Sequence, residues 1–226
     1  MLILIVWKNI TGRAIREQQR IAMTNAVAHN LKTPLCVING FSENLREESG
    51  YLTKQHYINV IQEQANEMDI LVHKMLNFSK LESDSAKLNI KSFNIKTELE
   101  NIAKKYNDIS SKNIIVTADD KEIFADKELM ELVFENLIEN AVKYSKDNSD
   151  IKISFANNNF NISNECDEIS KKDLKKIWKP YNRLEKDEEV RGTGIGLSIV
   201  KHILKLHRIK PYTEYSGGRL IIGFYI

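Results

Sequence analysis

The chain has 226 residues, which is enough for one large domain or two small ones. Its 33 lysine and arginine residues and 31 acidic residues leave a formal charge of +2, so the chain lacks the strong positive field of a dedicated nucleic-acid-binding protein and we expect no nucleic-acid partner. A hydrophobic content of 42% excludes a disordered chain, and the distant pair Cys36 and Cys166 excludes a disulfide framework.

The first residues combine an apolar run with basic residues. Residues 2–7 are apolar, but a transmembrane helix needs about 20 such residues. Lys8 and Arg13 follow the apolar run, whereas a signal peptide carries its basic residues first. We therefore interpret residues 1–12 as a stub next to a membrane-spanning segment. This predicts a cytoplasmic fragment of a protein that lies at the cytoplasmic face of the cell membrane. An apolar helix end that packs on a partner is the alternative.

Residues 13–85 have the pattern of a helical hairpin. Two helical runs, at about Arg13–Glu48 and Thr53–Leu81, flank a turn at Glu48–Gly50. The second run carries a heptad seam made of Tyr57, Ile61, Gln64, Met68, Leu71, Met75 and Phe78. Because an antiparallel hairpin buries only one face of each helix, we expect a homodimer that forms a four-helix bundle, with this seam between the subunits.

A polar segment, Ser79–Lys87, separates the hairpin from a differently patterned region at 88–226. Strands are predicted at Asn89–Phe93, Asn113–Thr117, Ile123–Ala125, Ile151–Ala156, Phe160–Ser163, Tyr212–Tyr215 and Arg219–Tyr225. Helices are predicted at Lys127–Tyr144, near Lys171–Trp178, and from the glycines of 192–196 to about His207. The pattern indicates an α+β fold with a core of its own.

Two asparagines stand out in the helix predicted at Lys127–Tyr144. Asn136 and Asn140 are one turn apart on the same face, and Lys143 lies on an overlapping face. Asparagine is a poor helix former, so two of them beside a lysine suit a site for magnesium and phosphate. The alternative interpretation is an amphipathic helix with solvated asparagines.

Glycines at alternate positions precede the last predicted helix. Gly192, Gly194 and Gly196 place free N–H groups at a helix N-terminus, where phosphate can bind. The run is neither a dinucleotide-binding GxGxxG motif after a strand nor a Walker A motif. Alone, this glycine run is weak support for a nucleotide site. A lone histidine such as His29 is likewise weak support for a catalytic role.

Together, in this order and spacing, these segments resemble the motifs of bacterial sensor histidine kinases. The matching segments are His29–Pro34 (H-box), Asn136–Tyr144 (N-box), Trp178–Arg183 (F-box) and Gly192–Gly196 (G2 box). The resemblance implies a dimerisation and histidine-phosphotransfer hairpin over 13–85 and a GHKL-type α/β-sandwich ATP-binding domain over 88–226. Within the family, the second domain is similar to sensors of the vancomycin-resistance type.

The resemblance also implies a phosphorelay. In it, Nε2 of His29 attacks the γ-phosphate of ATP, and the phosphoryl group then passes to an aspartate of a response regulator. Thr33 is implied to assist the later dephosphorylation of that regulator. Asn136 and Asn140 are implied as the Mg²⁺ ligands. The implied nucleotide-binding positions are Asn136, Asn140, Lys143, Tyr144, Asn164, Arg183, Gly192, Gly194, Gly196 and Leu197.

The chain departs from the family pattern at two places. Asn30 replaces the acidic residue that usually follows the histidine; its carbonyl can set the histidine tautomer but cannot take a proton. The adenine-binding box, normally Asp-x-Gly-x-Gly, is Asn164–Glu168 here. Asn164 can still accept a hydrogen bond from the adenine amino group, without the assistance of a charge.

These departures leave two alternatives open. The first is a degenerate kinase that acts mainly as a phosphatase of its response regulator. The second is a non-enzymatic dimeric scaffold whose second domain only docks a partner. A chaperone- or gyrase-type ATPase would not need the histidine-bearing hairpin.

The Asn30→Asp variant should phosphorylate itself faster than the wild type, because a carboxylate both stabilises the positive imidazole and accepts its proton. The measurement is the initial rate of phosphohistidine formation at matched ATP occupancy. An equal or lower rate in the variant would contradict this prediction.

Overall fold

A computed structural model describes residues 28, 31–46, 53–82, 88–179 and 194–226, with only the backbone of 73–82. The chain divides into two compact units, Met1–Asn77 and Phe78–Ile226. The predicted stub at 1–12 and the turn at Glu48–Gly50 lie outside the described residues. Within the described part of the chain, no helix combines the length and apolar character needed to span a membrane.

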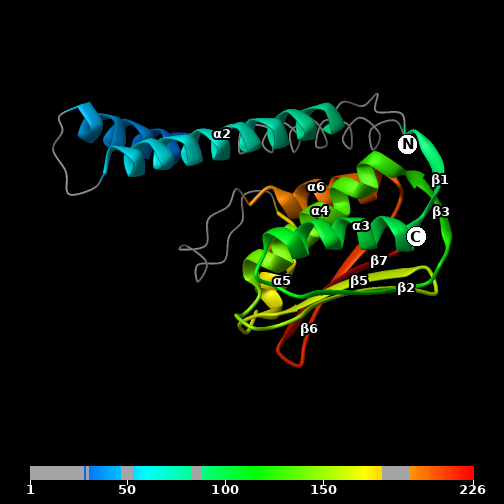
Figure 1. Cartoon of the computed structure of the whole chain (residues 1–226). Coiled ribbons are helices and arrows are strands. Elements are labelled where there is room, and N and C mark those ends of the chain that lie inside the picture. Colours follow the sequence, from blue (N-terminus) through cyan, green and yellow to red (C-terminus); the bar gives the residue numbers. More distant parts are fainter. Residues whose placement is uncertain (1–27, 29–30, 47–52, 83–87, 180–193) are drawn as a thin grey trace, which may run out of the picture. The chain divides into compact units, whose positions relative to one another are not determined.

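The first unit contains a helical hairpin. A helix over 31–46 lies beside α2 (Lys54–Glu82) (Figure 1). The bounds of α2 are close to the predicted ones, whereas the predicted start of the first helix lies outside the described residues. The Phe41 ring lies 5.7 Å from that of Tyr57, between ring centroids. Because this contact joins the end of one helix to the start of the next, the two helices are antiparallel.

Three of the five seam residues with described side chains are buried within the single chain, which corrects the expectation that the whole seam lies between subunits. Tyr57, Gln64 and Leu71 are only 6%, 6% and 4% exposed in the single chain. A heptad pattern shows that a helix face is covered but does not show which helix covers it. Other apolar side chains of the hairpin stay exposed, namely Leu35, Ile58, Ile70 and Val72.

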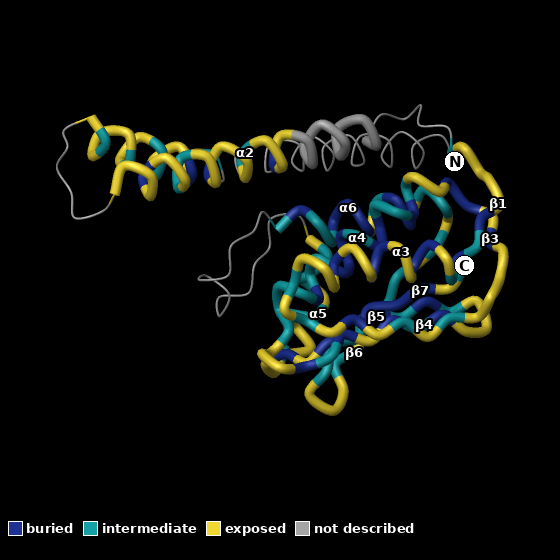
Figure 2. The backbone as a smooth tube through the Cα atoms, in the orientation of Figure 1, coloured by how far each residue is buried: buried dark blue, intermediate teal, exposed yellow. Residues whose placement is uncertain are grey.

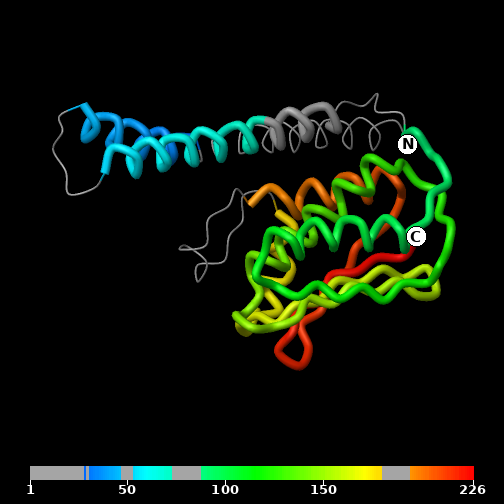
Figure 3. The backbone as a smooth tube through the Cα atoms, viewed as in Figure 1, coloured from blue at the N-terminus to red at the C-terminus, as the bar shows by residue number. Residues whose placement is uncertain are grey.

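The second unit is built on a five-stranded sheet of order β2-β4-β5-β7-β6. Only β2 and β4 pair in parallel, and the C-terminal hairpin of β6 and β7 adds to the edge of β5 (Figure 3). A separate antiparallel pair joins β1 to β3. The strands are β1 (Ile90–Asn94), β2 (Ile114–Ala118), β3 (Glu122–Asp126), β4 (Ile151–Ala156), β5 (Asn159–Glu165), β6 (Pro211–Ser216) and β7 (Arg219–Tyr225).

Three helices cover one face of this sheet (Figure 1). They are α3 (Ile95–Ile109), α4 (Lys127–Tyr144) and α6 (Gly196–Leu206), whereas α5 (Lys171–Lys176) is a short helix next to β6. Buried residues concentrate where the helices face the sheet (Figure 2). The rings of Phe134 on α4, Phe160 on β5 and Phe224 on β7 form a stack there, with centroid distances of 5.1 and 4.8 Å.

This two-layer sandwich confirms the predicted α+β fold, and every predicted strand and helix of the second unit is present. The structure also contains one helix that the sequence analysis did not predict, α3. Its signals are a cap and a helical period: Asn94 Oδ1 accepts a hydrogen bond from the N–H of Thr97, and Ile95, Leu99 and Ile102 are buried on one face.

The predicted turn between β4 and β5 contains two residues in the left-handed region. Asn157 and Asn158 have φ angles of +52° and +62°. Two successive residues with positive φ match the twist of the strands that they join, and asparagine tolerates this conformation better than most residues.

Replacing Asn157 with valine should lower the free energy of unfolding by about 1–2 kcal/mol, because a β-branched residue is strained at positive φ. The matched variant Asn157→Gly should cause no loss, since glycine adopts this φ freely. Urea unfolding measures both values. An equal loss in the two variants would show that the backbone conformation is not the cause.

Candidate nucleotide-binding site

Helix α4 is anchored at its N-terminus by a residue from the far end of the chain. Asp126 caps the helix by accepting a hydrogen bond from the N–H of Leu129. The N–H of Asp126 in turn donates to Nε2 of His207, at 3.1 Å. Nδ1 of His207 lies 2.9 Å from the carbonyl oxygen of Ile203. Since Nε2 accepts, Nδ1 must carry the proton, and this neutral imidazole links the start of α4 to the end of α6.

Asn136 and Asn140 lie where α4 faces the start of α6. Asn136 is 3% exposed, and its Nδ2 donates to the carbonyl oxygen of Leu132. Its Oδ1 and the Nδ2 of Asn140 are buried without a hydrogen-bond partner among the described residues. Buried polar atoms without partners are rare and often mark a binding site. These two amides therefore have unused hydrogen-bonding capacity at one place.

Gly196, the first residue of α6, permits this close packing. A Cβ atom at this position would lie 3.0 Å from Oδ1 of Asn136 and 3.5 Å from Nδ2 of Asn140. Gly194 has a φ of +66°, a conformation that favours glycine. No side chain of the described residues caps the N-terminus of α6. The N–H groups of a helix N-terminus are a common binding site for an anion such as a phosphate.

The other end of α4 carries Lys143 and Tyr144. Nζ of Lys143 lies 5.0 Å from the centroid of the Tyr144 ring, which is a cation–π distance. On the helix face that meets α3, the hydroxyl of Tyr106 donates to Oε1 of Glu139 at 3.1 Å. Burial, the nearby carboxylates of Glu139 and Glu135, and this hydrogen bond raise the pKa of Tyr106 far above its usual value. The phenol thus stays a donor, and it attaches α3 to α4.

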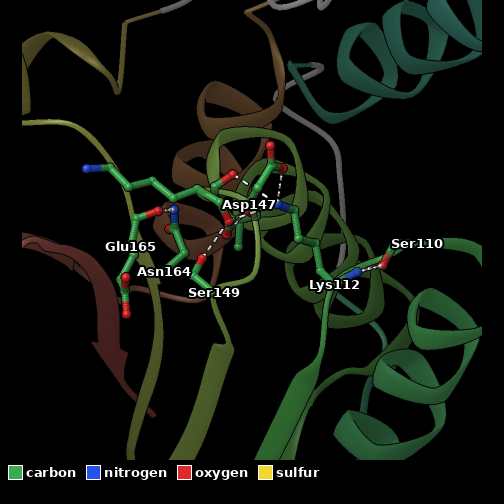
Figure 4. A network of polar contacts seen from close by, with 9 residues as sticks. Ser110, Lys112, Asp147, Ser149, Asn164 and Glu165 are labelled. Atoms are coloured by element: carbon green, nitrogen blue, oxygen red, sulfur yellow. Dashed lines mark hydrogen bonds and ion pairs between the residues drawn. The ribbon is translucent and has the colours of Figure 1, made fainter.

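Asn164 lies at the end of β5 and is 4% exposed. Its Nδ2 donates to the carbonyl oxygen of Glu165 at 3.4 Å, and the N–H of Lys146 donates to the same oxygen at 2.9 Å (Figure 4). These contacts attach the turn after α4 to the strand end that carries Asn164. Asp167 forms an exposed ion pair with Lys146, with 3.2 Å between Nζ and Oδ1.

The structure thus brings part of the predicted site together around α4. Gly196 meets the two N-box asparagines directly. Lys143 and Tyr144 end the same helix, and a turn attached to Glu165 follows them. Thr33 lies exposed on the hairpin helix, in the other unit. The predicted residues outside the described part of the chain are His29, Asn30, Arg183 and Gly192.

Two protein families match the chain, one for each region. Residues 19–84 match the His Kinase A (phospho-acceptor) domain. Residues 125–222 match the histidine kinase-, DNA gyrase B- and HSP90-like ATPase domain. The chain therefore contains a His Kinase A phospho-acceptor domain followed by a histidine kinase-like ATPase domain. No comparison shows a relation to the vancomycin-resistance sensors in particular.

The curated relatives that match nearly the whole chain are longer than it. The chain is 25% identical to the sensor histidine kinase ArsS of Helicobacter pylori over 205 residues, which cover 90% of this chain and 46% of ArsS. It is 27% identical to the sensor protein kinase WalK of Staphylococcus aureus over 229 aligned residues, which cover 95% of this chain and 55% of WalK. The chain therefore spans about half the length of these relatives.

Solved structures share the fold. The histidine kinase AdeS of Acinetobacter baumannii superposes with a TM-score of 0.71 at 22% identity, covering 88% of this chain and 96% of AdeS. The histidine kinase ThkA, solved in complex with the response regulator protein TrrA, gives a TM-score of 0.71 at 23% identity, covering 97% of this chain and 66% of ThkA. ShkA, solved in complex with AMPPNP, gives 0.63 at 13% identity, covering 89% of this chain and 45% of ShkA.

Sequence reasoning missed the residues that hold the site in place. His207 and Tyr106 have no motif around them, and each acts on a residue far away in the sequence. The helical period of α3 could have placed Tyr106 on a buried face. Nothing in the local sequence of His207 indicates its contact with Asp126.

Replacing Asn136 with leucine should raise the free energy of unfolding by about 1 kcal/mol in the absence of nucleotide, because it removes a buried acceptor that has no partner. The control is Asn107→Leu. Asn107 forms hydrogen bonds with both the N–H and the carbonyl of Ile114, so its replacement should lower this free energy by about 1 kcal/mol. Urea unfolding of both variants tests the contrast, and a loss at Asn136 as large as that at Asn107 would contradict it.

Proposed function

We propose that the chain is an ATP-dependent protein-histidine kinase that phosphorylates its own His29 and transfers the phosphoryl group to an aspartate of a response regulator. The observation that carries the proposal is the pair of buried amide atoms, Oδ1 of Asn136 and Nδ2 of Asn140, which have no hydrogen-bond partner among the described residues and lie against the glycine that begins α6. The pair places an amide oxygen, which can ligate a metal ion, and an amide N–H donor, which can bind a phosphate oxygen, beside a helix N-terminus.

The residues present fit Mg-ATP. The amides of Asn136 and Asn140 would hold Mg²⁺, which usually keeps several waters and phosphate oxygens and so needs few protein ligands. The N–H groups at the start of α6 and the ammonium of Lys143 would bind phosphate oxygens. Asn164 would accept a hydrogen bond from the adenine amino group, and Tyr144 would lie against the nucleotide. When bound between these residues and the phosphates, Mg²⁺ would supply positive charge that offsets the negative charge of the transferred phosphate.

The hairpin supports a homodimer. Leu35, Ile58, Ile70 and Val72 are between 38% and 55% exposed in the single chain. Apolar residues along a hairpin are the surface that a second hairpin covers in a four-helix bundle. A bundle would present His29 and Thr33 to the ATP-binding domain in one step and to the response regulator in the next.

The proposed partner and location follow the relatives. ThkA has been solved in complex with a response regulator, which supports the same class of partner for this chain. ArsS and WalK are sensor proteins of about twice this length. We infer a location at the cytoplasmic face of the cell membrane, with residues 1–12 next to the membrane segment.

A phosphatase that has lost most of its kinase activity is the second candidate function. Asn30 and Asn164 favour it, because each replaces a carboxylate of the family pattern with a neutral amide. The two N-box asparagines favour the kinase, since each keeps a buried amide atom that has no partner among the described residues and could bind a nucleotide or its metal ion.

Incubation with [γ-³²P]ATP and Mg²⁺ should label the wild-type chain with an acid-labile, base-stable phosphate that is absent from the His29→Ala variant. The matched control is His56→Ala, which removes another histidine of the hairpin and should keep the label. Equal labelling of the His29→Ala variant would exclude His29 as the acceptor. Nucleotide binding without any label would favour the phosphatase, and no binding would favour a scaffold.

A further inference from the structure

Lys112 holds the turn that follows α4. Its side chain is 10% exposed, and Nζ donates to the carbonyl oxygens of Ser145 and Lys146 at 3.2 and 2.9 Å (Figure 4). Nζ also lies 3.1 Å from Oδ1 of Asp147, but this carboxylate is fully exposed. An exposed ion pair contributes little, whereas carbonyls at a helix C-terminus lack helical partners and carry partial negative charge. The contacts of Lys112 with the two carbonyls therefore contribute most to holding this turn.

The peptide group between Ser145 and Lys146 connects Lys112 to β5. Its carbonyl accepts from Lys112, and its N–H donates to the carbonyl oxygen of Glu165 at 2.9 Å. That oxygen also accepts from Nδ2 of Asn164 at 3.4 Å. Hydrogen bonds that share a peptide group polarise one another in the same direction. A chain of hydrogen bonds thus runs from the Lys112 ammonium to the Glu165 carbonyl oxygen, which the Asn164 amide contacts as a second donor (Figure 4).

The orientation of Asn164 matters because an amide has two different ends. Either oxygen of a carboxylate can accept a hydrogen bond from an amino group, so a rotated aspartate would still recognise adenine. A rotated asparagine would present its NH₂ group instead and repel the adenine amino group. Since the Glu165 carbonyl engages Nδ2 of Asn164, it leaves Oδ1 as the acceptor.

We propose that Lys112 is a positioning residue for nucleobase recognition: it fixes the Glu165 carbonyl, which orients the Asn164 amide to accept a hydrogen bond from the 6-amino group of a purine. This inference rests on the proposed function, in which Asn164 lies at the adenine. Lys112 touches neither the nucleotide nor the phosphates in this proposal, and it acts only through Asn164.

The test compares ATP with purine riboside triphosphate, which lacks the 6-amino group, in calorimetric titrations of the full chain with Mg²⁺. The wild type should bind ATP more tightly. The Lys112→Met variant should lose about three- to tenfold in ATP affinity and nothing for the analogue, so that the preference disappears. An equal loss for both nucleotides would show a merely structural role and overturn the inference, as would an unchanged preference.

Three further variants sharpen the test. Ser149→Ala removes another hydrogen bond to the Lys146 carbonyl. It should reduce the preference for ATP, but by less than Lys112→Met does. This variant provides a second measurement in case the lysine variant folds poorly. Asp147→Ala is the matched control and should leave the preference unchanged. In an Asn164→Asp background, Lys112→Met should no longer alter the preference, because a carboxylate has no orientation to lose.

The outcomes separate this inference from the proposed function. A wild-type chain that binds neither nucleotide would remove the proposed function and this inference with it. A wild-type chain that prefers ATP, together with a Lys112→Met variant that keeps the preference, would overturn this inference alone.

Discussion

The close contact between α4 and α6 is the constraint on which the nucleotide site depends. Glycine at residue 196 favours this contact, since a Cβ atom there would lie only 3.0 Å from Oδ1 of Asn136. Two polar atoms at this contact are buried without partners among the described residues, and a buried polar atom that lacks a partner costs about 1–3 kcal/mol. A cost of this kind persists where function needs it, and the aromatic stack beneath α4 and the His207 bridge keep the helices together despite it.

Much of the fold could be predicted because its local signals agree with its tertiary structure. Alternating apolar residues and Asn-Asn or Gly-Gly turns predict the strands of the second unit. Apolar residues repeating at the helical period predict α2, α4 and α6. The helix α3 was missed although Asn94 caps it and its buried face has a helical period. The seam on α2 was assigned to the wrong partner because burial of Leu71 has the same sequence signal in either arrangement.

The site was predictable only in part, for a different reason. Motifs select residues that would touch a ligand, so they pointed to Asn136, Asn140 and Gly196. Supporting residues such as Lys112 and His207 act through backbone groups of distant residues. Almost any residue type can supply a backbone carbonyl or N–H, so the sequence does not indicate which residue such a supporting side chain contacts. Only the fold, which brings Lys112 to the end of α4, reveals such a role.

The strand pairing also determines the order in which the two units can form. The hairpin needs contacts between neighbours in sequence, such as Phe41 and Tyr57. The sheet instead needs Ile114 to pair with Ile151 in parallel, and Asn159 with Tyr225. Such distant pairs form slowly, because a long loop must close before any contact stabilises it. On the ribosome, the sheet cannot be completed until β7, the last strand, has been made, whereas the hairpin can fold while the second unit is still being synthesised.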